Sequence, residues 1–369
     1  MKKVGLLTLP LKDNYGGVLQ ALALYTHLER MGCEVTLIQK EVFYPHWKKV
    51  LVILLEWLPF QNFKKFRSTR LNGKIHKGLI DSIIIRKTER AFTRFDMERI
   101  ASRYNFDAVV VGSDQVWRPQ YTDRVYYGVY FLDFLDEVQT RRISYAASFG
   151  LDFWSYPEKE SEIRQLLSEF DALSSRETSG VELCAKFGRS DCLHVVDPTL
   201  LVGRDFYSAL IDGMPLDQDK NILCYILDDD EFKRKLISNC GLALGQKLAL
   251  RYIYTKDSDR QIYTVPGWLR AFADAEYVIT DSFHGVVFSI IFNKKFIAIS
   301  NPERGAGRFE SLLGRLGLKD RLVSIDSDAN LSADAGSLLD AEIDYGRVNN
   351  LLDEWRLLSK KFLHGAING

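Results

Sequence analysis

The sequence predicts an α/β fold made of two doubly wound domains that face a cleft. Two series of short apolar runs alternate with helical patterns, the first starting at residue 3 and the second at residue 221. Such alternation is typical of parallel sheets covered by helices. With 369 residues and 46% apolar side chains, the chain is long enough and apolar enough for two packed cores.

The first series begins with a βαβ unit. We expect a strand at residues 3–8, a Gly/Asn loop at 9–17, a helix at 18–31 that ends at Gly32, and a second strand at 33–38. Further strand-like runs lie at 108–111, 142–146, 172–174 and 194–196, with a helical stretch at 157–170. These elements predict a Rossmann-like domain.

The second series predicts another domain of the same class. Its strand-like runs lie at 221–227, 247–252, 277–280 and 295–299, and helical patterns occupy the gaps. The stretch 197–201 separates the two series. We therefore expect a Rossmann-like domain at 1–203, a second at 204–345, and a C-terminal helix at 346–369 that packs back.

One stretch interrupts the alternation. Residues 43–100 have a helical, basic and aromatic pattern, and residues 40–100 carry 14 Lys or Arg against 6 Asp or Glu. Their longest apolar run is far shorter than the roughly 20 residues that span a bilayer. Two interpretations stay open: a helical insertion packed on its own domain, or peripheral membrane contact by an amphipathic helix within residues 43–75.

Charge, cysteine usage and the N-terminal residues bear on partners and location. Lys plus Arg and Asp plus Glu both total 49, so the overall charge gives no reason to expect a nucleic-acid partner. The five cysteines contain no CxxC pair, which favours reduced thiols. Because Pro10 interrupts the first apolar run, we expect a strand there instead of a signal peptide, and a cytoplasmic protein.

Several common site signatures are absent from the sequence. It contains no GxGxxG, no GxxxxGK[ST] and no GxSxG, so the usual dinucleotide, P-loop and hydrolase motifs are missing. No cluster of His, Cys and acidic residues has the spacing of a zinc site. We therefore expect neither a metal nor a resident cofactor.

The first strand-end loop contains Asn14, Tyr15, Gly16 and Gly17. Paired glycines let the backbone approach a ligand closely. Amides at the start of the following helix suit an anion or a sugar hydroxyl. A purely structural turn is the other interpretation.

A second loop follows the apolar run that ends at residue 111. Gly112 and Ser113 allow a tight turn, and Asp114 and Gln115 bring a carboxylate and an amide to the sheet edge, followed by Trp117. A helix N-cap is the alternative use of Asp114.

Loops 144–150 and 173–177 follow strand-like runs and should reach the same sheet edge. Within the second of these, Arg176 stands at a strand end, where a guanidinium can bind a carboxylate or phosphate bidentately. An ion pair with Glu177 is the alternative interpretation of this residue.

In the second domain, residues 280–285 form a strand-to-helix turn. His284, whose ordinary pKa lies near ~6.5, can donate to an anion or act as a general acid, with Ser282 before it and Gly285 after it. The loop after the next strand brings Arg304 and Arg308, which indicates a further anion-binding group. A surface loop is the alternative there.

Taken together, five motifs resemble those of the polysaccharide pyruvyl transferase family. They lie in order at residues 14–17, 112–117, 144–150, 175–177 and 281–285. The likeness extends from residue 4 to about residue 315. It implies an architecture similar to the GT-B glycosyltransferases, with phosphoenolpyruvate as co-substrate. A hydroxyl pair on a sugar of a cell-surface polysaccharide, or of its lipid-linked precursor, would accept the pyruvyl group as a cyclic ketal, and phosphate would leave.

The resemblance also implies roles for individual residues. Arg176 and His284 would bind the donor, with Ser282 and Gly285 beside the histidine, and His284 would serve as the acid. Asp114 or Asp13 is the expected base. The residues expected to contact the acceptor are Asn14, Tyr15, Gly16, Gly17, Gln115 and Trp117.

The chain departs from the family pattern at one position. Members often carry Arg where this chain has Phe283, so one donor-binding cation is missing there. Because burying an unpaired carboxylate or phosphate is costly, another cation should replace it, and Arg308 and Arg304 are the two candidates.

Two other functions remain open from the sequence. One is a nucleotide-sugar glycosyltransferase on the same architecture, and the other is a non-catalytic module that binds a sugar or an anion. The sequence also leaves homo-oligomerisation open.

Overall fold

The structure is a computed structural model. It describes residues 1–12, 14–41, 75–122, 127–135, 139–216, 221–244, 249–254, 263–300, 305–324 and 329–369. The chain divides into two compact units. Unit 1 comprises Met1–Leu201 and Trp355–Gly369, and unit 2 comprises Val202–Glu354, so the division falls after Leu201 where the sequence suggested residue 203.

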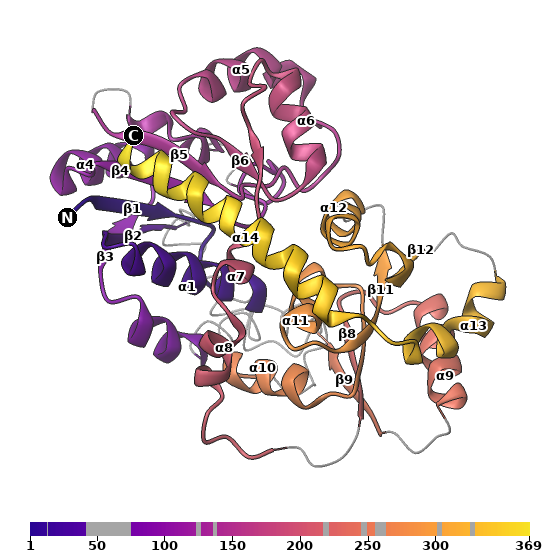
Figure 1. The fold of residues 1–369 in the computed structure, drawn as a ribbon. Helices are drawn as coiled ribbons and strands as arrows, with labels where there is room; N and C mark the ends of the chain where they lie inside the picture. The colour runs from indigo at the N-terminus through magenta and orange to yellow at the C-terminus, as the bar shows by residue number, and fades with distance from the viewer. Residues whose placement is uncertain are drawn as a thin grey trace, which may run out of the picture. The chain divides into compact units, whose positions relative to one another are not determined.

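Unit 1 is built on a parallel sheet with the strand order β3-β2-β1-β4-β5 (Figure 1). Its strands are β1 (Lys3–Leu7), β2 (Glu34–Lys40), β3 (Lys87–Ala91), β4 (Ala108–Gly112) and β5 (Arg141–Tyr145). A short parallel pair, β6 (Ser174–Ser175) and β7 (Leu193–His194), continues beyond β5 through bridges such as Ile143 to Ala172. The strand order reverses between β1 and β4, and the loops that follow these strands flank the crevice where such sheets bind ligands.

The helices of unit 1 follow the strands as a doubly wound fold requires. They are α1 (Tyr15–Arg30), α4 (Arg94–Tyr104), α5 (Glu160–Ser168), α6 (Thr178–Lys186) and α7 (Pro198–Leu201), together with helical residues 75–83 and three short 3-10 turns at Tyr127–Phe131, Asp133–Leu135 and Pro157–Lys159. Helix α4 shows a local reason for its start, because Thr93 and Asp96 form a reciprocal capping box. Asn105 ends it in a left-handed conformation.

One prediction for this unit is wrong. The stretch 43–100 was expected to be helical throughout, yet Lys87–Ala91 forms the edge strand β3 beside β2. Its sequence, Lys-Thr-Glu-Arg-Ala, is polar because an edge strand keeps one side in water. Residues 42–74, which include most of the segment suggested to contact a membrane, lie outside the described residues.

Unit 2 has a second parallel sheet, with the order β12-β11-β10-β8-β9. Its strands are β8 (Asn221–Ile226), β9 (Ala249–Tyr254), β10 (Tyr277–Thr280), β11 (Lys295–Ser300) and β12 (Leu322–Ser324). Its helices are α8 (Arg204–Leu210), α9 (Glu231–Ala243), α10 (Val265–Asp274), α11 (Phe283–Ile291), α12 (Gly307–Leu316) and α13 (Ala329–Asp340), and a 3-10 turn spans Lys319–Arg321. Here the order reverses between β8 and β10, so the loops after those strands mark the ligand-binding edge.

The last helix, α14 (Tyr345–Asn368), is the long yellow helix in Figure 1. From Trp355 onward its residues belong to unit 1. There the indole nitrogen of Trp355 donates to the carbonyl of His194 at 3.1 Å, and Ser359 accepts from the backbone nitrogen of Val196 at 3.0 Å. The chain therefore begins and ends in the same unit.

Candidate functional site

The loop after β4 has an unusual backbone. Ser113 and Asp114 both have positive φ angles, 42° and 63°, and Gly112 has φ 157°. A Cβ atom at Gly112 would lie 2.0 Å from the carbonyl oxygen of Tyr145, so only glycine fits there. Consecutive non-glycine residues in the left-handed region are strained, and such strain often marks a functional site.

This backbone presents the carboxylate of Asp114 to the start of α1. One oxygen, Oδ1, accepts from the backbone nitrogen of Gln115 at 2.9 Å. The other, Oδ2, accepts from the side-chain amide of Asn14 at 3.1 Å. A Cβ atom at Gly17 would lie 3.3 Å from the same Oδ2, so the glycine leaves room for the carboxylate beside the first turn of the helix. The structure thus brings together Asn14, Gly17 and Asp114, which the sequence predicted for one sheet edge.

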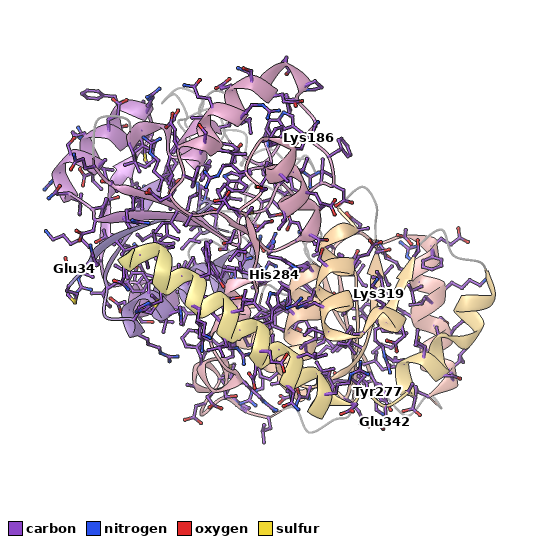
Figure 2. The ribbon with its side chains drawn as sticks, turned by 45° about the horizontal axis from the view of Figure 1, so that its top comes forward. Glu34, Lys186, Tyr277, His284, Lys319 and Glu342 are labelled. Carbon is purple, nitrogen blue, oxygen red and sulfur yellow. The ribbon has the colours of Figure 1, made fainter. Side chains whose placement is uncertain are left out.

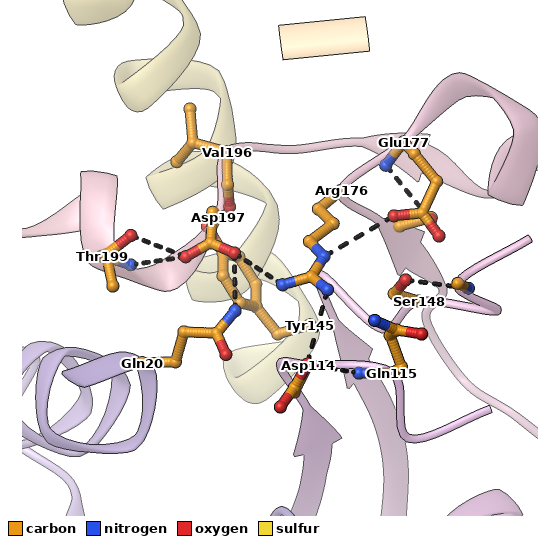
Figure 3. A network of polar contacts seen from close by, with 12 residues as sticks. Gln20, Asp114, Gln115, Tyr145, Ser148, Arg176, Glu177, Val196, Asp197 and Thr199 are labelled. Atoms are coloured by element: carbon orange, nitrogen blue, oxygen red, sulfur yellow. Dashed lines mark hydrogen bonds and ion pairs between the residues drawn. The ribbon is translucent and has the colours of Figure 1, made fainter. Parts of the chain in front are cut away.

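Arg176 lies at the centre of a buried charge cluster in unit 1 (Figure 3). Its side chain has no exposed surface, and Nη1 donates to Asp197 Oδ2 at 2.9 Å. Two further carboxylates form longer ion pairs with it, Asp114 at 3.6 Å from Nη2 and Glu177 at 3.6 Å from Nε. Burial alone would lower the pKa of Arg176, but Asp197, Asp114 and Glu177 together raise it above its ordinary value. The guanidinium is therefore held in its charged form.

Asp197 anchors this cluster. Its Oδ2 also accepts from the side-chain amide of Gln20 at 2.6 Å, and its Oδ1 accepts from the nitrogen and hydroxyl of Thr199 at 3.0 and 2.7 Å. Nearby, the hydroxyl of Tyr145 donates to the carbonyl of Val196 at 3.1 Å, and burial together with Asp197 raises the pKa of Tyr145 well above its ordinary range. The carboxylate of Asp197 thus receives four hydrogen bonds, as a buried charge requires.

Arg176 has these contacts within unit 1, and its role in donor binding stays a prediction. The sequence suggested that it binds the donor, but here it presents no surface to solvent and is bound to carboxylates of its own unit. Glu177, which sequence reasoning offered as an alternative ion-pair partner, is part of the cluster. Gln20 and Asp197 were not identified as functional residues, because their sequence positions lie 177 residues apart and no local pattern connects them.

Two side chains predicted to bind the acceptor are buried, and that role stays a prediction. Trp117 is 1% exposed, donates to the carbonyl of Tyr130 at 3.0 Å, and its ring stacks on that of Phe131, so it is a core residue. Gln115 is buried, and its side-chain oxygen accepts from Arg118 at 2.8 Å. Neither side chain is exposed to a sugar in this arrangement.

The other acceptor predictions concern the start of α1. Tyr15, Gly16 and Gly17 form its first turn and are buried, and the ring of Tyr15 meets that of His76 edge to face at 5.2 Å. Asn14 is the exposed N-cap residue, and its side chain contacts Asp114 where a cap would normally contact the helix. Asp13 lies outside the described residues.

In unit 2, the turn between β10 and α11 positions His284. Ser282 caps α11, because its hydroxyl accepts from the backbone nitrogen of Gly285 at 3.3 Å. A Cβ atom at Gly285 would lie 2.2 Å from the hydroxyl oxygen of Thr280, so this position also requires glycine. His284, labelled in Figure 2, is 8% exposed in the first turn of the helix. An imidazole at a helix N-terminus is suited to contact an anion.

Arg308 supplies a cation next to this turn. It lies in the first turn of α12, which follows β11, the strand paired with β10. Its guanidinium carbon lies 5.7 Å from the centre of the Phe283 ring, within the range of a cation–π contact. The ring of Phe283 also meets those of His284 and Phe309 edge to face. Arg308 thus stands beside the position where the cation expected from the family is missing, while Arg304 lies outside the described residues.

One residue of the turn between β10 and α11 belongs to a buried ion pair. Asp281 accepts from the backbone nitrogens of Leu227 and Asp228 at 2.6 and 3.1 Å, and pairs with Lys233 at 3.0 Å. Lys233 is fully buried near the start of α9 and also contacts Asp230 at 2.9 Å. The pair ties the loop after β8 to the loop after β10. Lys233 was not predicted from the sequence, because one lysine in a helical pattern resembles a solvent-exposed residue.

The described residues contain neither a cluster of metal-binding side chains nor a helix that could span a membrane. No group of three or more His, Cys, Asp or Glu side chains there is arranged to hold a metal ion. None of the described helices is both long and apolar enough to cross a membrane.

The two parallel sheets, each with charged and polar side chains at its switch point, define a two-domain α/β protein of the GT-B class. A UDP-N-acetylglucosamine 2-epimerase from Rickettsia bellii shares this fold, with a TM-score of 0.56, 9% identity, and coverage of 98% of this chain and 95% of that one. The corresponding Neisseria meningitidis epimerase, solved with UDP-GlcNAc, has a TM-score of 0.53, 10% identity, and coverage of 97% and 100%. UGT89C1 of Arabidopsis thaliana, solved with UDP-L-rhamnose, has a TM-score of 0.54 and 13% identity, with coverage of 100% of this chain and 99% of that one. At these identities the likeness concerns the fold alone.

Sequence comparison narrows the class to a family. Residues 14–303 match the family described as polysaccharide pyruvyl transferase, and this chain belongs to that family. The matched segment includes the start of α1, the cluster around Arg176 and the His284 turn. No curated protein sequence matches the chain.

Proposed function

We propose that this protein transfers the pyruvyl group of phosphoenolpyruvate to a hydroxyl pair of a sugar in a cell-surface polysaccharide or its lipid-linked precursor. The product would be a cyclic ketal, and phosphate would be released. Membership of the family supports a transferase that acts in polysaccharide biosynthesis. The observation that carries the proposal further is that Arg308 and His284 both contact the ring of Phe283 in unit 2.

The donor is a small, strongly anionic molecule. Its phosphate and carboxylate need cations or oriented N–H groups when they leave water. In unit 2, Arg308 provides a guanidinium, and α11 and α12 direct their N-termini toward the edge after β10 and β11. We therefore assign the donor to this edge, with Ser282 and Gly285 forming the turn that fixes His284.

Pyruvyl transfer to a hydroxyl pair requires one acid and one base. Protonated His284 would give its proton to the methylene carbon of phosphoenolpyruvate, which becomes the methyl group and leaves an oxocarbenium-like centre at C2. One sugar hydroxyl would attack C2 as a base takes its proton. The second hydroxyl would then form the other C–O bond as the C–O bond to phosphate breaks, and its proton would leave with the phosphate. The sum is one donor and one diol giving one ketal and one hydrogen phosphate.

Asp114 suits the part of the base because its carboxylate lies at a switch-point loop and beside the first turn of α1. An acceptor hydroxyl at that helix N-terminus would meet the carboxylate and the amide of Asn14. A membrane-borne acceptor would be consistent with the basic, aromatic segment at 43–75. Membrane contact by that segment and self-association of the chain stay predictions.

The test measures phosphate release and pyruvyl mass gain when the protein is mixed with phosphoenolpyruvate and a panel of glycans. For Arg308→Ala we expect the KM for phosphoenolpyruvate to rise about 10- to 100-fold, since a charged hydrogen bond contributes about 1.5–3 kcal/mol. Arg315→Ala, on the exposed face of the same helix, is the matched control and should leave this KM unchanged. His284→Gln should lower kcat.

Two results would overturn the proposal. One is consumption of a nucleotide sugar with release of a nucleoside diphosphate, which would make the protein a glycosyltransferase. The other is binding of a sugar or anion without turnover of phosphoenolpyruvate by any acceptor in the panel, which would make it a binding module.

A further inference from the structure

Two large aromatic side chains are exposed on the loops that follow β4 and β5 in unit 1. Tyr121, in the loop after β4, is 53% exposed, and Phe153, in the loop after β5, is 62% exposed. The two loops are joined close to these residues, because the side-chain amide of Gln120 donates to the hydroxyl of Ser155 at 3.2 Å. Single exposed apolar residues are common on protein surfaces, but two exposed aromatic rings on joined loops indicate a contact surface.

Both aromatic residues stand on loops that are held in place. Next to Phe153, Trp154 is buried in the core of unit 1, and its indole nitrogen donates to the carbonyl of Tyr156 at 2.6 Å. The backbone nitrogen of Tyr121 donates to the carbonyl of Arg118 at 2.9 Å, and the guanidinium carbon lies 4.6 Å from the centre of the tyrosine ring, within cation–π range. Rings held in this way lose little conformational freedom when they bind a ligand.

Arg118 also connects Tyr121 to the strained loop after β4. Its Nη1 donates to the side-chain oxygen of Gln115 at 2.8 Å, and the backbone nitrogen of Gln115 donates to Asp114. A Cβ atom at Gly150 would lie 2.1 Å from that side-chain oxygen, so the loop after β5 packs closely on the loop after β4. The exposed rings therefore continue the sheet edge to which the acceptor hydroxyls were assigned.

We propose that Tyr121 and Phe153, the aromatic pair, bind sugars of the acceptor chain that lie beyond the sugar receiving the pyruvyl group. The acceptor of a polysaccharide pyruvyl transferase is a chain of sugars, and the sugars that do not react must lie along the protein surface. The C–H groups on one face of a sugar ring carry partial positive charge and pack against the electron-rich face of an aromatic ring. This inference rests on the proposed function, because it assumes that the acceptor is a sugar chain.

The polar groups beside the aromatic pair favour a sugar over a lipid surface. Gln120 and Asp152 are exposed next to the two rings, and an amide and a carboxylate can both bind sugar hydroxyls. Residues 112–122 and 146–156 contain one arginine and no lysine, whereas contact with anionic lipid is typical of clustered cations.

The first test uses the phosphate-release assay with acceptors of increasing length, from a single sugar to hexasaccharides. In the wild type, the KM for the acceptor should fall as the chain grows. Tyr121→Ala and Phe153→Ala should each raise the KM for the hexasaccharide about 3- to 10-fold, and the double variant about 10- to 100-fold. The change in kcat should be smaller, because contacts far from the reacting atoms bind substrate and transition state alike.

Matched variants separate stacking on a ring from a general loss of apolar surface. Tyr121→Phe and Phe153→Tyr keep the rings and should stay within about twofold of the wild-type KM, whereas Tyr121→Leu and Phe153→Leu should behave like the alanine variants. Phe95→Ala is a further control, because Phe95 is 70% exposed but follows β3, at the opposite end of the strand order from β5. A rise in KM that is as large in Phe95→Ala as in Tyr121→Ala contradicts the inference.

A second readout needs no phosphoenolpyruvate. Saturation-transfer NMR measures binding of hexasaccharides of glucose, galactose, mannose and N-acetylglucosamine to the wild type and to Tyr121→Ala/Phe153→Ala. Binding that the double variant loses supports the inference, and if phosphoenolpyruvate is not consumed, only the proposed function fails.

Three outcomes would overturn the inference. Pyruvyl transfer with the same KM at every chain length and in every variant would do so while leaving the proposed function in place. Absence of hexasaccharide binding by the wild type would also do so. The third is binding to vesicles of phosphatidylglycerol and phosphatidylethanolamine that the double variant loses while its sugar binding is unchanged, which would assign the aromatic pair to a lipid surface.

Discussion

The guanidinium of Arg308 lies over the ring of Phe283, with 5.7 Å between the guanidinium carbon and the ring centre. The two residues stand in the first turns of α12 and α11, which follow the paired strands β11 and β10. The resemblance to the family implies an arginine at the position of Phe283. A positive charge lies at this sheet edge, on the neighbouring helix α12 and over the aromatic ring.

We predict that an arginine at position 283 can replace the guanidinium of Arg308. Arg308→Ala should weaken binding of phosphoenolpyruvate, and the double variant Phe283→Arg/Arg308→Ala should recover at least about fivefold of that loss, because one guanidinium again faces the donor. The KM for phosphoenolpyruvate measures both effects. Phe283→Leu/Arg308→Ala is the control, since it changes the same two positions without restoring a charge. Equal KM values for the two double variants would show that Arg308 does not replace the missing arginine.

Gly285 predicts a stability effect at the His284 turn. In Gly285→Ala the new methyl group would lie 2.2 Å from Thr280 Oγ1. Thr280 cannot easily turn away, because this hydroxyl donates to the carbonyl of Tyr225 at 2.7 Å and accepts from the nitrogen of Ser282 at 3.1 Å. Overpacking of this kind costs about 1–3 kcal/mol, so we expect the free energy of unfolding in urea to fall by about 2 kcal/mol.

Gly241 provides the matched control for that change. It lies in helix α9 of the same unit, and a Cβ atom there would have its nearest neighbour at 4.0 Å, a methyl of Leu250. Gly241→Ala should therefore leave stability unchanged or raise it by up to about 1 kcal/mol, because alanine favours the helix. If both substitutions have the same effect, close packing against Thr280 is not what requires glycine at 285.

The buried pair of Lys233 and Asp281 predicts a larger loss. Lys233→Ala removes the cation 3.0 Å from the carboxylate of Asp281, which is 1% exposed and also accepts from two backbone amides, so a buried charge loses its lysine partner. Breaking a buried pair in this way costs about 3–5 kcal/mol, and equilibrium unfolding in urea measures it. Lys235→Ala, an exposed lysine two residues further along the same helix, should change stability by less than about 0.5 kcal/mol. Comparable losses in the two variants would contradict a special role for Lys233.

Sequence reasoning predicted those parts of the fold that depend on local pattern. Apolar runs identified β4 and β10, which are buried along their whole length, and the polar residues after them lie at the switch points. The edge strand β3 was missed because Lys87, Glu89 and Arg90, which are exposed in part or in full, give a pattern that does not differ from a polar helix.

The side-chain contacts of the site join residues that lie far apart in the sequence, so most of them could not be predicted from it. Trp117 follows a functional loop in sequence but turns into the aromatic core against Phe131. Asp197, in the stretch that separates the two series, reaches Gln20 and Arg176 only after the whole of unit 1 has folded. Residue type and a strand-end position can nominate a side chain, but only the packed structure decides which charges meet.

His27 predicts how the stability of unit 1 depends on pH. This buried histidine of α1 has its pKa lowered from 6.5 to about 4, first by burial and then by the positive charges of Lys360 and Arg30. His27 therefore takes up a proton near pH 6.5 in the unfolded chain, but only near pH 4 in the folded chain. The stability that neutral His27 contributes to the folded state is fully present above pH 6.5 and is lost as the pH falls toward 4.

The size of that loss follows from the same pKa change and can be isolated by substitution. A lowering from 6.5 to about 4 corresponds to about 3 kcal/mol between neutral pH and pH 4. His27→Gln carries no titrating group, so its free energy of unfolding, measured in urea at steps from pH 7.5 to 4.5, should fall less steeply than that of the wild type. His364→Gln, which replaces an exposed histidine of α14, is the control and should follow the wild-type curve. Parallel curves for wild type and His27→Gln would mean that the folded protein accommodates a charged His27.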